Sequence, residues 1–411
     1  MKQDRTRCGR RPTMKIVDIR AVRVVPPDRP APAGATARSW HYTAEVANPM
    51  SGYARYKSHR SLWLPAWEQT WCQVTLEDGT RGLGSTSHGR VTAAIIDDHL
   101  APILVGEDGY AVERLADMMF RLTKPYGSGG LAAYAVSAVD LALWDAKGRS
   151  LGQPVYSLIG GPVRDSIPCY ATGNDVDWYQ TCGYTRFKLA CPYGPADGLA
   201  GLDKNEAFVA DARARVGDQS DLMLDCWMAF DVEYTVELAN RLRPYRLKWM
   251  EEYLIPEDFD GHLEVRRRLP WQTLATGEHW YGVQPFQWAA RHQAIDIFQP
   301  DIAWCGGLST CLKIAAVAES AGKRLILHGG GNTVWGQHFS ISRACVPLLE
   351  CFQSTDPGVE PTDGVTSPGL AVPVHGSLVP NTGPGFGLEI EDAWIENFFT
   401  SSQPDVPQPT N

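Results

Sequence analysis

The feature of this chain that most limits its fold is a series of short apolar runs recurring at nearly constant spacing in its second half. Acidic residues and a histidine accompany these runs, 22 to 27 positions apart, and all but Glu251 directly follow or close one. Each interval is long enough for one helix, as in the amphipathic run DVEYTVELANRLRPY. Strands that alternate with helices at this period indicate parallel βα units. The residues concerned are Asp225, Glu251, Glu278, Asp301, His328 and Glu350.

This pattern predicts an α/β fold, a (β/α)8-type barrel with an N-terminal α+β capping domain that the C-terminal segment completes. At 411 residues the chain is long enough for a barrel of about 250 residues and a second domain. The carboxyl ends of all the strands of such a barrel meet at one face. We therefore expect the six polar residues to converge on one pocket.

The remaining segments divide the chain into four predicted parts. Residues 1–13 form a basic extension without the apolar stretch of a secretory signal. Residues 14–155 form the cap, with a first strand, a hairpin in WCQVTLEDGTRGLGST and a helical region. Residues 156–367 form the barrel, which begins with the strands PCYATG and TRFKLA. Residues 368–411 return to the cap and end in a disordered tail.

The composition argues against several classes of protein. A net charge of −9, without a basic stripe, argues against a nucleic-acid partner. No run of about 20 apolar residues is present, so we expect no membrane span. The 10 cysteines include no CxxC pair, which is typical of reduced thiols in a cytoplasmic protein. An anionic substrate would need a local positive site, from a metal or from arginines.

Asp225, Glu251 and Glu278 are candidate metal ligands. Three converging carboxylates repel one another and raise each other's pKa unless a cation lies between them. One carboxylate from each of three strands, with positions left for water or substrate, suits Mg²⁺. The alternative is that each is an independent surface acid or helix cap.

His328 and Asp301 are candidates for a base and the carboxylate that orients it, because such a carboxylate fixes the tautomer and stabilises the imidazolium. The alternative is a packed or surface histidine. Glu350 could hydrogen-bond a substrate oxygen that gains negative charge, for which it would have to be protonated. Lys188 shares a strand face with Ala190, so it is either a cation inside the barrel or a lysine at its rim.

Several motifs resemble those of the enolase superfamily, in its mandelate racemase-like subgroup. The segment AVSAVDLALWDAKGRSLGQPVYSLIGGPVRD and the later PGFG are similar to segments found throughout that subgroup. From about Met14 to about Ile390, further motifs are similar to those of L-rhamnonate dehydratases. They are NPMSGYARY, YGSGGL, CYATG, LMLDCWM, LKWMEE, TGEH, QPDIAWCGGL and HGGG.

The resemblance implies one Mg²⁺ per subunit on Asp225, Glu251 and Glu278, and His328 as a base that Asp301 orients. It also implies a homo-oligomer that acts on a small sugar acid. In this interpretation Glu350 contacts the substrate carboxylate. The substrate contacts expected besides are Arg60, Lys188, His279 and, in the cap loop, His41.

The reaction that the resemblance implies is dehydration of L-rhamnonate or a related aldonate. Abstraction of the α-proton gives a metal-stabilised enediolate, and loss of the β-hydroxyl then gives a 2-keto-3-deoxy acid. A dehydratase for another aldonate or aldarate would keep these residues. A racemase or cycloisomerase would need a second base, and Ala190 stands where it is expected. A non-catalytic enolase-like binding protein would predict a damaged ligand set, and a nicotinamide oxidoreductase is the most distant interpretation.

Overall fold

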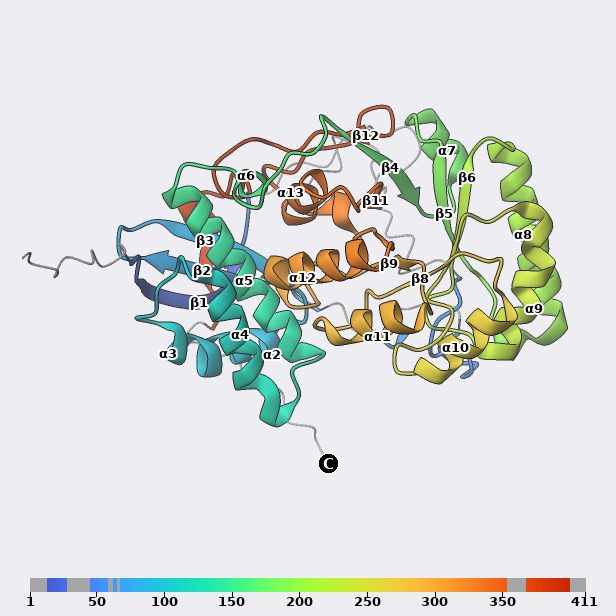
Figure 1. Cartoon of the computed structure of the whole chain (residues 1–411), viewed down its shortest axis with the longest axis horizontal. Helices are drawn as coiled ribbons and strands as arrows, with labels where there is room; N and C mark the ends of the chain where they lie inside the picture. Colours follow the sequence, from blue (N-terminus) through green and yellow to red (C-terminus); the bar gives the residue numbers. More distant parts are fainter. Residues whose placement is uncertain (1–12, 28–44, 58–61, 65–66, 353–366, 400–411) are drawn as a thin grey trace, which may run out of the picture.

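The computed structural model describes residues 13–27, 45–57, 62–64, 67–352 and 367–399. Figure 1 shows a cap, built around an antiparallel sheet, beside a larger body in which helices surround a parallel sheet. This arrangement confirms the predicted fold class. Among the helices of the described ranges, none has both the length and the apolar character that crossing a bilayer requires.

The cap sheet has the strand order β13-β1-β2-β3. β2 and β3 form the predicted hairpin around an Asp-Gly turn. β13 comes from the C-terminal segment and pairs antiparallel with β1, so residues from both ends of the chain complete one sheet. The strands are β1 (Ile16–Val24), β2 (Thr70–Leu76), β3 (Arg81–Thr86) and β13 (Ile395–Asn397).

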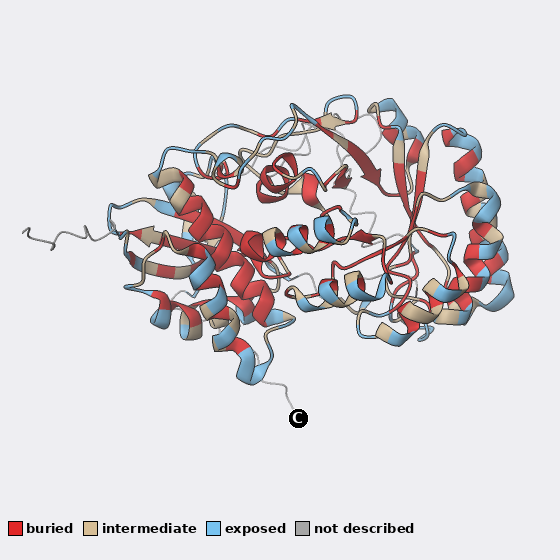
Figure 2. Ribbon diagram, viewed as in Figure 1, coloured by how far each residue is buried: buried red, intermediate tan, exposed pale blue. Residues whose placement is uncertain are grey.

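Helix α5 (Leu131–Ser150) connects the cap to the barrel and is almost entirely buried (Figure 2). It packs closely on β3 because Gly82 and Gly84 have no side chain; a Cβ at Gly84 would lie 2.3 Å from the Ala138 carbonyl oxygen. On the barrel side, Trp144 Nε1 donates to Ser309 Oγ at 3.0 Å. The other cap helices are α2 (Gly89–Ala94), a π-helical turn (Ile95–Leu100), α3 (Ala101–Leu104) and α4 (Val112–Thr123).

The barrel sheet has eight parallel strands in the order β10-β9-β8-β7-β6-β5-β4-β11. They are β4 (Ile167–Thr172), β5 (Arg186–Ala190), β6 (Asp221–Asp225), β7 (Met250–Glu251), β8 (Leu274–Thr276), β9 (Ile297–Phe298), β10 (Arg324–Leu325) and β11 (Leu349–Phe352). All eight coincide with predicted strands. A short strand, β12 (Ser377–Leu378), pairs antiparallel with β4.

A helix occupies each connection between successive barrel strands, and the helices lie around the sheet in Figure 1. They are α7 (Val176–Thr181), α8 (Gly198–Val216), α9 (Val232–Leu242), α10 (Phe259–Arg268), α11 (Gln284–His292), α12 (Gly307–Ser320) and α13 (Val334–Ile341), with α6 (Val155–Leu158) ahead of β4. Short 3-10 turns lie at Lys124–Tyr126, Pro195–Asp197, Arg243–Tyr245, Gly330–Asn332 and Asp392–Trp394.

An apolar layer inside the barrel forms the floor of the polar site. Met223 and Trp249 lie two residues before Asp225 and Glu251, so strand alternation puts each pair on the same inward face. The layer is fully or almost fully buried and consists of Tyr170, Met223, Trp249, Ala275, Ile297, Ile326 and Leu348. The polar strand ends above it are therefore closed to water from below.

A buried histidine on α10 makes the fold sensitive to acid. Burial lowers the pKa of His262 to about 4, while its Nδ1 lies 3.1 Å from the Tyr253 hydroxyl. The unfolded chain takes up this proton near pH 6.5. The stability that neutral His262 contributes is therefore complete above pH 6.5 and is lost as the pH falls toward 4.

We expect the free energy of unfolding to fall from about pH 7 to about pH 5, and His262→Gln to remove part of this fall. Urea unfolding at both pH values measures it. His292→Gln, at an exposed position on α11, is the matched control and should keep the pH dependence of the unsubstituted protein. An unchanged pH dependence in His262→Gln would contradict the prediction.

Candidate functional site

A cavity of about 550 Å³ lies at the carboxyl ends of the barrel strands, and both the barrel and the cap line it. From the barrel come Asp225, Glu278, His279, His328 and Ala190. The cap contributes apolar and aromatic side chains and one histidine, namely Val46, Met50, Trp63, Leu64, Trp67 and His88. The cavity therefore has a charged floor and a largely apolar roof.

Lys188 lies beneath this cavity, fully buried, and contacts three carboxylates. Its Nζ lies 2.6 Å from Glu350 Oε1 and 3.3 Å from Asp225 Oδ2, and it also pairs with Glu251 Oε1. Burial alone would lower the pKa of Lys188, but the three carboxylates raise it well above its usual value. Of the two interpretations of this lysine, the structure favours the cation inside the barrel.

Glu350 is held in its ionised form. Thr172 Oγ1 donates to Glu350 Oε1 at 2.5 Å, and the Gly329 amide donates to Glu350 Oε2 at 2.8 Å. Although burial opposes ionisation, Lys188 and His328 keep the pKa of Glu350 below its ordinary value. The expectation of a protonated Glu350 is therefore wrong, because a cation rather than another anion contacts its carboxylate.

His328 and Asp301 lie together as the spacing predicted. His328 Nδ1 is 2.8 Å from Asp301 Oδ2, and the Ala303 amide donates to Asp301 Oδ1 at 2.7 Å. This leaves Nε2 of His328 as the nitrogen away from Asp301, 3.7 Å from Glu278 Oε1. Burial lowers the pKa of His328, but Glu278 and Asp301 outweigh burial and raise it to about 10.

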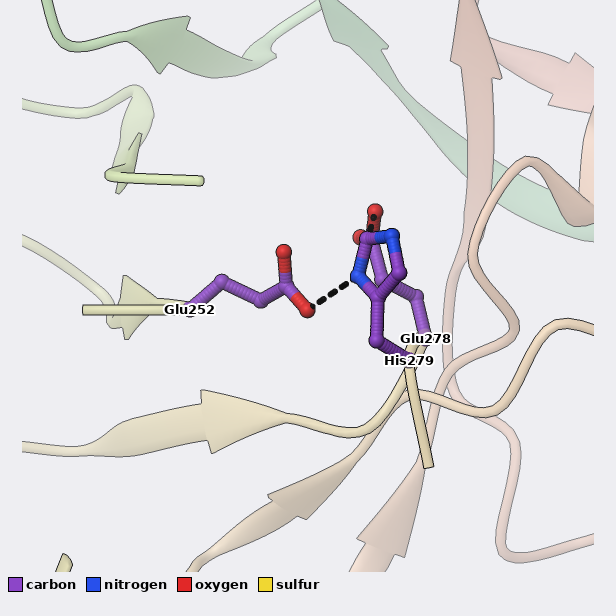
Figure 3. Close-up of side chains that lie close together, drawn as sticks. All are labelled: Glu252, Glu278 and His279. Carbon is purple, nitrogen blue, oxygen red and sulfur yellow. Dashed lines mark hydrogen bonds and ion pairs between the residues drawn. The ribbon is translucent and has the colours of Figure 1, made fainter. Parts of the chain in front are cut away.

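Figure 3 shows Glu252, Glu278 and His279, whose ligand atoms lie within 4.8 Å of one another. His279 Nδ1 is 2.7 Å from Glu252 Oε1 and 3.6 Å from Glu278 Oε1. Despite burial, which lowers it, these two carboxylates raise the pKa of His279 to about 9. His279 is therefore a cation that Glu252 orients toward Glu278.

Glu252 is a site residue that the sequence interpretation missed. Its φ of +44° is in the left-handed region, so the strand alternation that would turn consecutive side chains to opposite faces fails at this point. Both Glu251 and Glu252 are thus part of the polar site. The one signal in the sequence was the Glu-Glu pair itself, directly after Met250.

The predicted ligand Glu251 is already bonded through both oxygens. Besides Lys188, it accepts from Trp249 Nε1 at 2.8 Å and from Gln299 Nε2 at 2.7 Å. Asp225 accepts from the Trp227 amide at 3.0 Å. The structure thus gathers the three predicted carboxylates around one region, with Glu252 as a fourth.

The donor set fits a divalent cation. Within the described ranges, no donor lies within hydrogen-bonding distance of the buried Glu278 carboxylate, and its nearest cationic atoms are 3.6 and 3.7 Å away. Burial and Glu252 raise the pKa of Glu278 to about 7. A buried carboxylate without a hydrogen-bond donor is stabilised when a positive ion binds it, and Mg²⁺ prefers hard oxygen ligands such as carboxylates. The two remaining predicted contacts, His41 and Arg60, lie outside the described residues.

Two family models match the chain. Residues 67–160 match the mandelate racemase / muconate lactonizing enzyme N-terminal domain, and residues 174–394 match the enolase C-terminal domain-like family. The second match alone covers more than half of the chain.

The chain is also similar to individual proteins. It is 41% identical over 351 residues to an L-rhamnonate dehydratase of Saccharopolyspora erythraea, covering 84% of this chain and 89% of that protein. The crystal structure of rhamnonate dehydratase from Gibberella zeae complexed with Mg has a TM-score of 0.86 and 31% identity, over 94% and 96% of the two chains. A 3,6-anhydro-D-galactonate cycloisomerase from Zobellia galactanivorans shares the fold, with a TM-score of 0.71 and 24% identity over 93% and 99%.

Proposed function

The chain belongs to the enolase superfamily, in the mandelate racemase and muconate lactonizing enzyme family, and from this premise we propose that it is a Mg²⁺-dependent hydro-lyase acting on sugar acids. The proposed substrate is L-rhamnonate or a related aldonate, and the product is the 2-keto-3-deoxy acid. The observation that carries the proposal is the His328–Asp301 pair, of which His328 lines the same cavity as Glu278 and lies beside its carboxylate.

The proposed metal ligands are Asp225, Glu251 and Glu278. Mg²⁺ bound there would stabilise the negative charge that develops on the substrate carboxylate when the α-proton leaves. Lys188, fully buried against Asp225 and Glu251, would offset part of the negative charge of this carboxylate cluster. Glu252 would act through His279, whose cationic ring it orients.

His328 is the proposed base. Its Nδ1 is occupied by Asp301, so Nε2 is the nitrogen that can take the α-proton. Because the Glu278 charge is the main cause that raises the pKa of His328, a cation held by Glu278 would lower this pKa and favour the neutral ring that a base requires. Once protonated, His328 can return a proton to the departing β-hydroxyl on the same face of the substrate. Asp301 stabilises the imidazolium between the two steps.

Ala190 supports a dehydratase over a racemase. It lines the cavity on β5, at the position where a second base would be needed on the opposite face of the substrate. A methyl group can neither accept nor return a proton. The expected homo-oligomer and cytoplasmic location stay predictions.

The test is a screen of the purified protein with Mg²⁺ against C4 to C6 aldonates and aldarates, with semicarbazide detection of 2-keto products. We expect the strongest signal from L-rhamnonate. A signal only from another acid would keep the reaction and change the substrate. No product from any acid, with Mg²⁺ demonstrably bound, would overturn the proposed function in favour of a binding protein.

A further inference from the structure

The cap places a third histidine, His88, on the wall of the cavity. It lies between β3 and α2 and shares the cavity with His279 and His328. Its φ of +76° is one that residues other than glycine adopt uncommonly, and Gly89 follows at +52°. These two left-handed residues set the direction of the chain where the His88 ring meets the site.

The ring of His88 is held in a fixed orientation by two aromatic side chains. Its centroid lies 4.5 Å from that of Tyr134 at an interplanar angle of 62°, and 5.4 Å from that of Trp67 at 88°. Tyr134 in turn stacks on Trp304 at 5.5 Å, and Trp304 lies 4.8 Å from His328. Two intervening rings therefore separate His88 from the proposed base.

Nδ1 of His88 is buried and has no hydrogen-bond partner among the residues that the structure describes. Nε2 is not among the buried unpaired atoms, and the hydrogen bonds found within these ranges include none from it. If His88 served only to pack against Tyr134 and Trp67, a phenyl ring would do the same without leaving polar atoms unpaired. Nε2, the nitrogen that is not fully buried, is therefore the atom of His88 that a molecule bound in the cavity could contact.

The ring is in the form that can both donate and accept. Burial and the positive charge of His279 lower the pKa of His88, so the neutral imidazole prevails. A neutral imidazole offers one N–H donor and one acceptor nitrogen, which matches an alcohol and does not match a carboxylate. The carboxylate of a substrate is instead expected to bind the positive charges at the proposed metal site and at His279.

We propose that His88 hydrogen-bonds a hydroxyl group at C4 or C5 of the sugar acid and so determines the specificity of the site for the distal end of the substrate. This inference rests on the proposed function, because it takes the reacting carbons to lie beside His328. The far end of an extended acid chain would then lie toward the rings that separate His328 from His88.

The test compares His88→Phe, which keeps a packed ring and removes both nitrogens, with the unsubstituted enzyme on L-rhamnonate and its 4-deoxy and 5-deoxy analogues. We expect kcat/KM for L-rhamnonate to fall about tenfold, mainly through KM. For the deoxy analogue that lacks the hydroxyl bonded to His88, the same substitution should change kcat/KM by less than about twofold. His88→Gln should recover part of the loss.

The substitution could also lower activity through backbone strain at the φ of +76°. Such strain would affect all three acids equally, whereas a lost hydrogen bond would spare the analogue that lacks the bonded hydroxyl. An equal loss for all three acids, or no loss for any, would overturn the proposal. Tyr134→Phe is the control for a change in the same ring cluster, and it should not discriminate between the analogues.

A second measurement separates this inference from the reaction itself. Calorimetry with L-rhamnonate and the Mg²⁺-loaded His328→Asn protein reports binding without turnover. Weaker binding when His88→Phe is added would support the role of His88 even if no product forms with the unsubstituted enzyme. If His88→Phe leaves binding unchanged, or if L-rhamnonate does not bind at all, the proposal fails.

Discussion

Replacing His328 by Asn should lower the rate of dehydration by about 1000-fold or more while leaving Mg²⁺ binding nearly intact. The loss is expected to be large because one imidazole is proposed both to remove the α-proton and to protonate the leaving hydroxyl. Asn keeps a polar side chain beside Asp301 but cannot exchange a proton at neutral pH. The measurements are kcat for 2-keto acid formation and Mg²⁺ affinity by calorimetry.

Exchange of the α-proton in deuterated water tests the same assignment without requiring elimination. The unsubstituted enzyme should exchange this proton for deuterium if reprotonation of the enediolate at the α-carbon competes with loss of the hydroxyl. His328→Asn should not exchange it. Exchange or turnover near the normal rate in this variant would remove the His328–Asp301 pair from the mechanism.

Replacing Glu278 by Gln should weaken Mg²⁺ binding by about 100-fold or more and abolish activity. Loss of a residue that only supports a metal ligand typically costs roughly 10- to 100-fold in affinity, so loss of a ligand should exceed this. Glu278 belongs both to the predicted ligand set and to the cluster with Glu252 and His279. It is therefore the acid whose removal should have the largest effect.

The adjacent pair Glu251 and Glu252 provides a matched comparison. If Asp225, Glu251 and Glu278 hold the ion, Glu251→Gln should weaken Mg²⁺ binding by as much as Glu278→Gln is expected to. Glu252→Gln should lose about tenfold or less, because it acts through the ring of His279. Calorimetric titration with Mg²⁺ measures both variants. The reverse order would place Glu252 in the ligand set and Glu251 with Lys188 as a structural ion pair.

The sequence alone was enough to predict the barrel and several of the charged residues at its mouth. Regular spacing of strand ends depends only on local properties, namely apolar runs, helix-length intervals and the rule that parallel strands end at one face. Asp225 closes β6, as the apolar run before it indicated. Glu251, the one residue that did not follow or close such a run, closes β7 and was predicted from the regular spacing alone. The contact between His328 and Asp301 follows from neighbouring strand ends in the same way.

Only the tertiary structure decided which way particular side chains turn and which charges they meet. The left-handed backbone of Glu252 brings a fourth carboxylate to the site, and alternation along a strand cannot predict such a break. Glu350 is ionised because Lys188, from a different strand, contacts it in a buried interior. His88 reaches the cavity because the cap sheet and α5 place it there. Each of these outcomes depends on groups far apart in the chain, whose approach and burial fix their charge and direction.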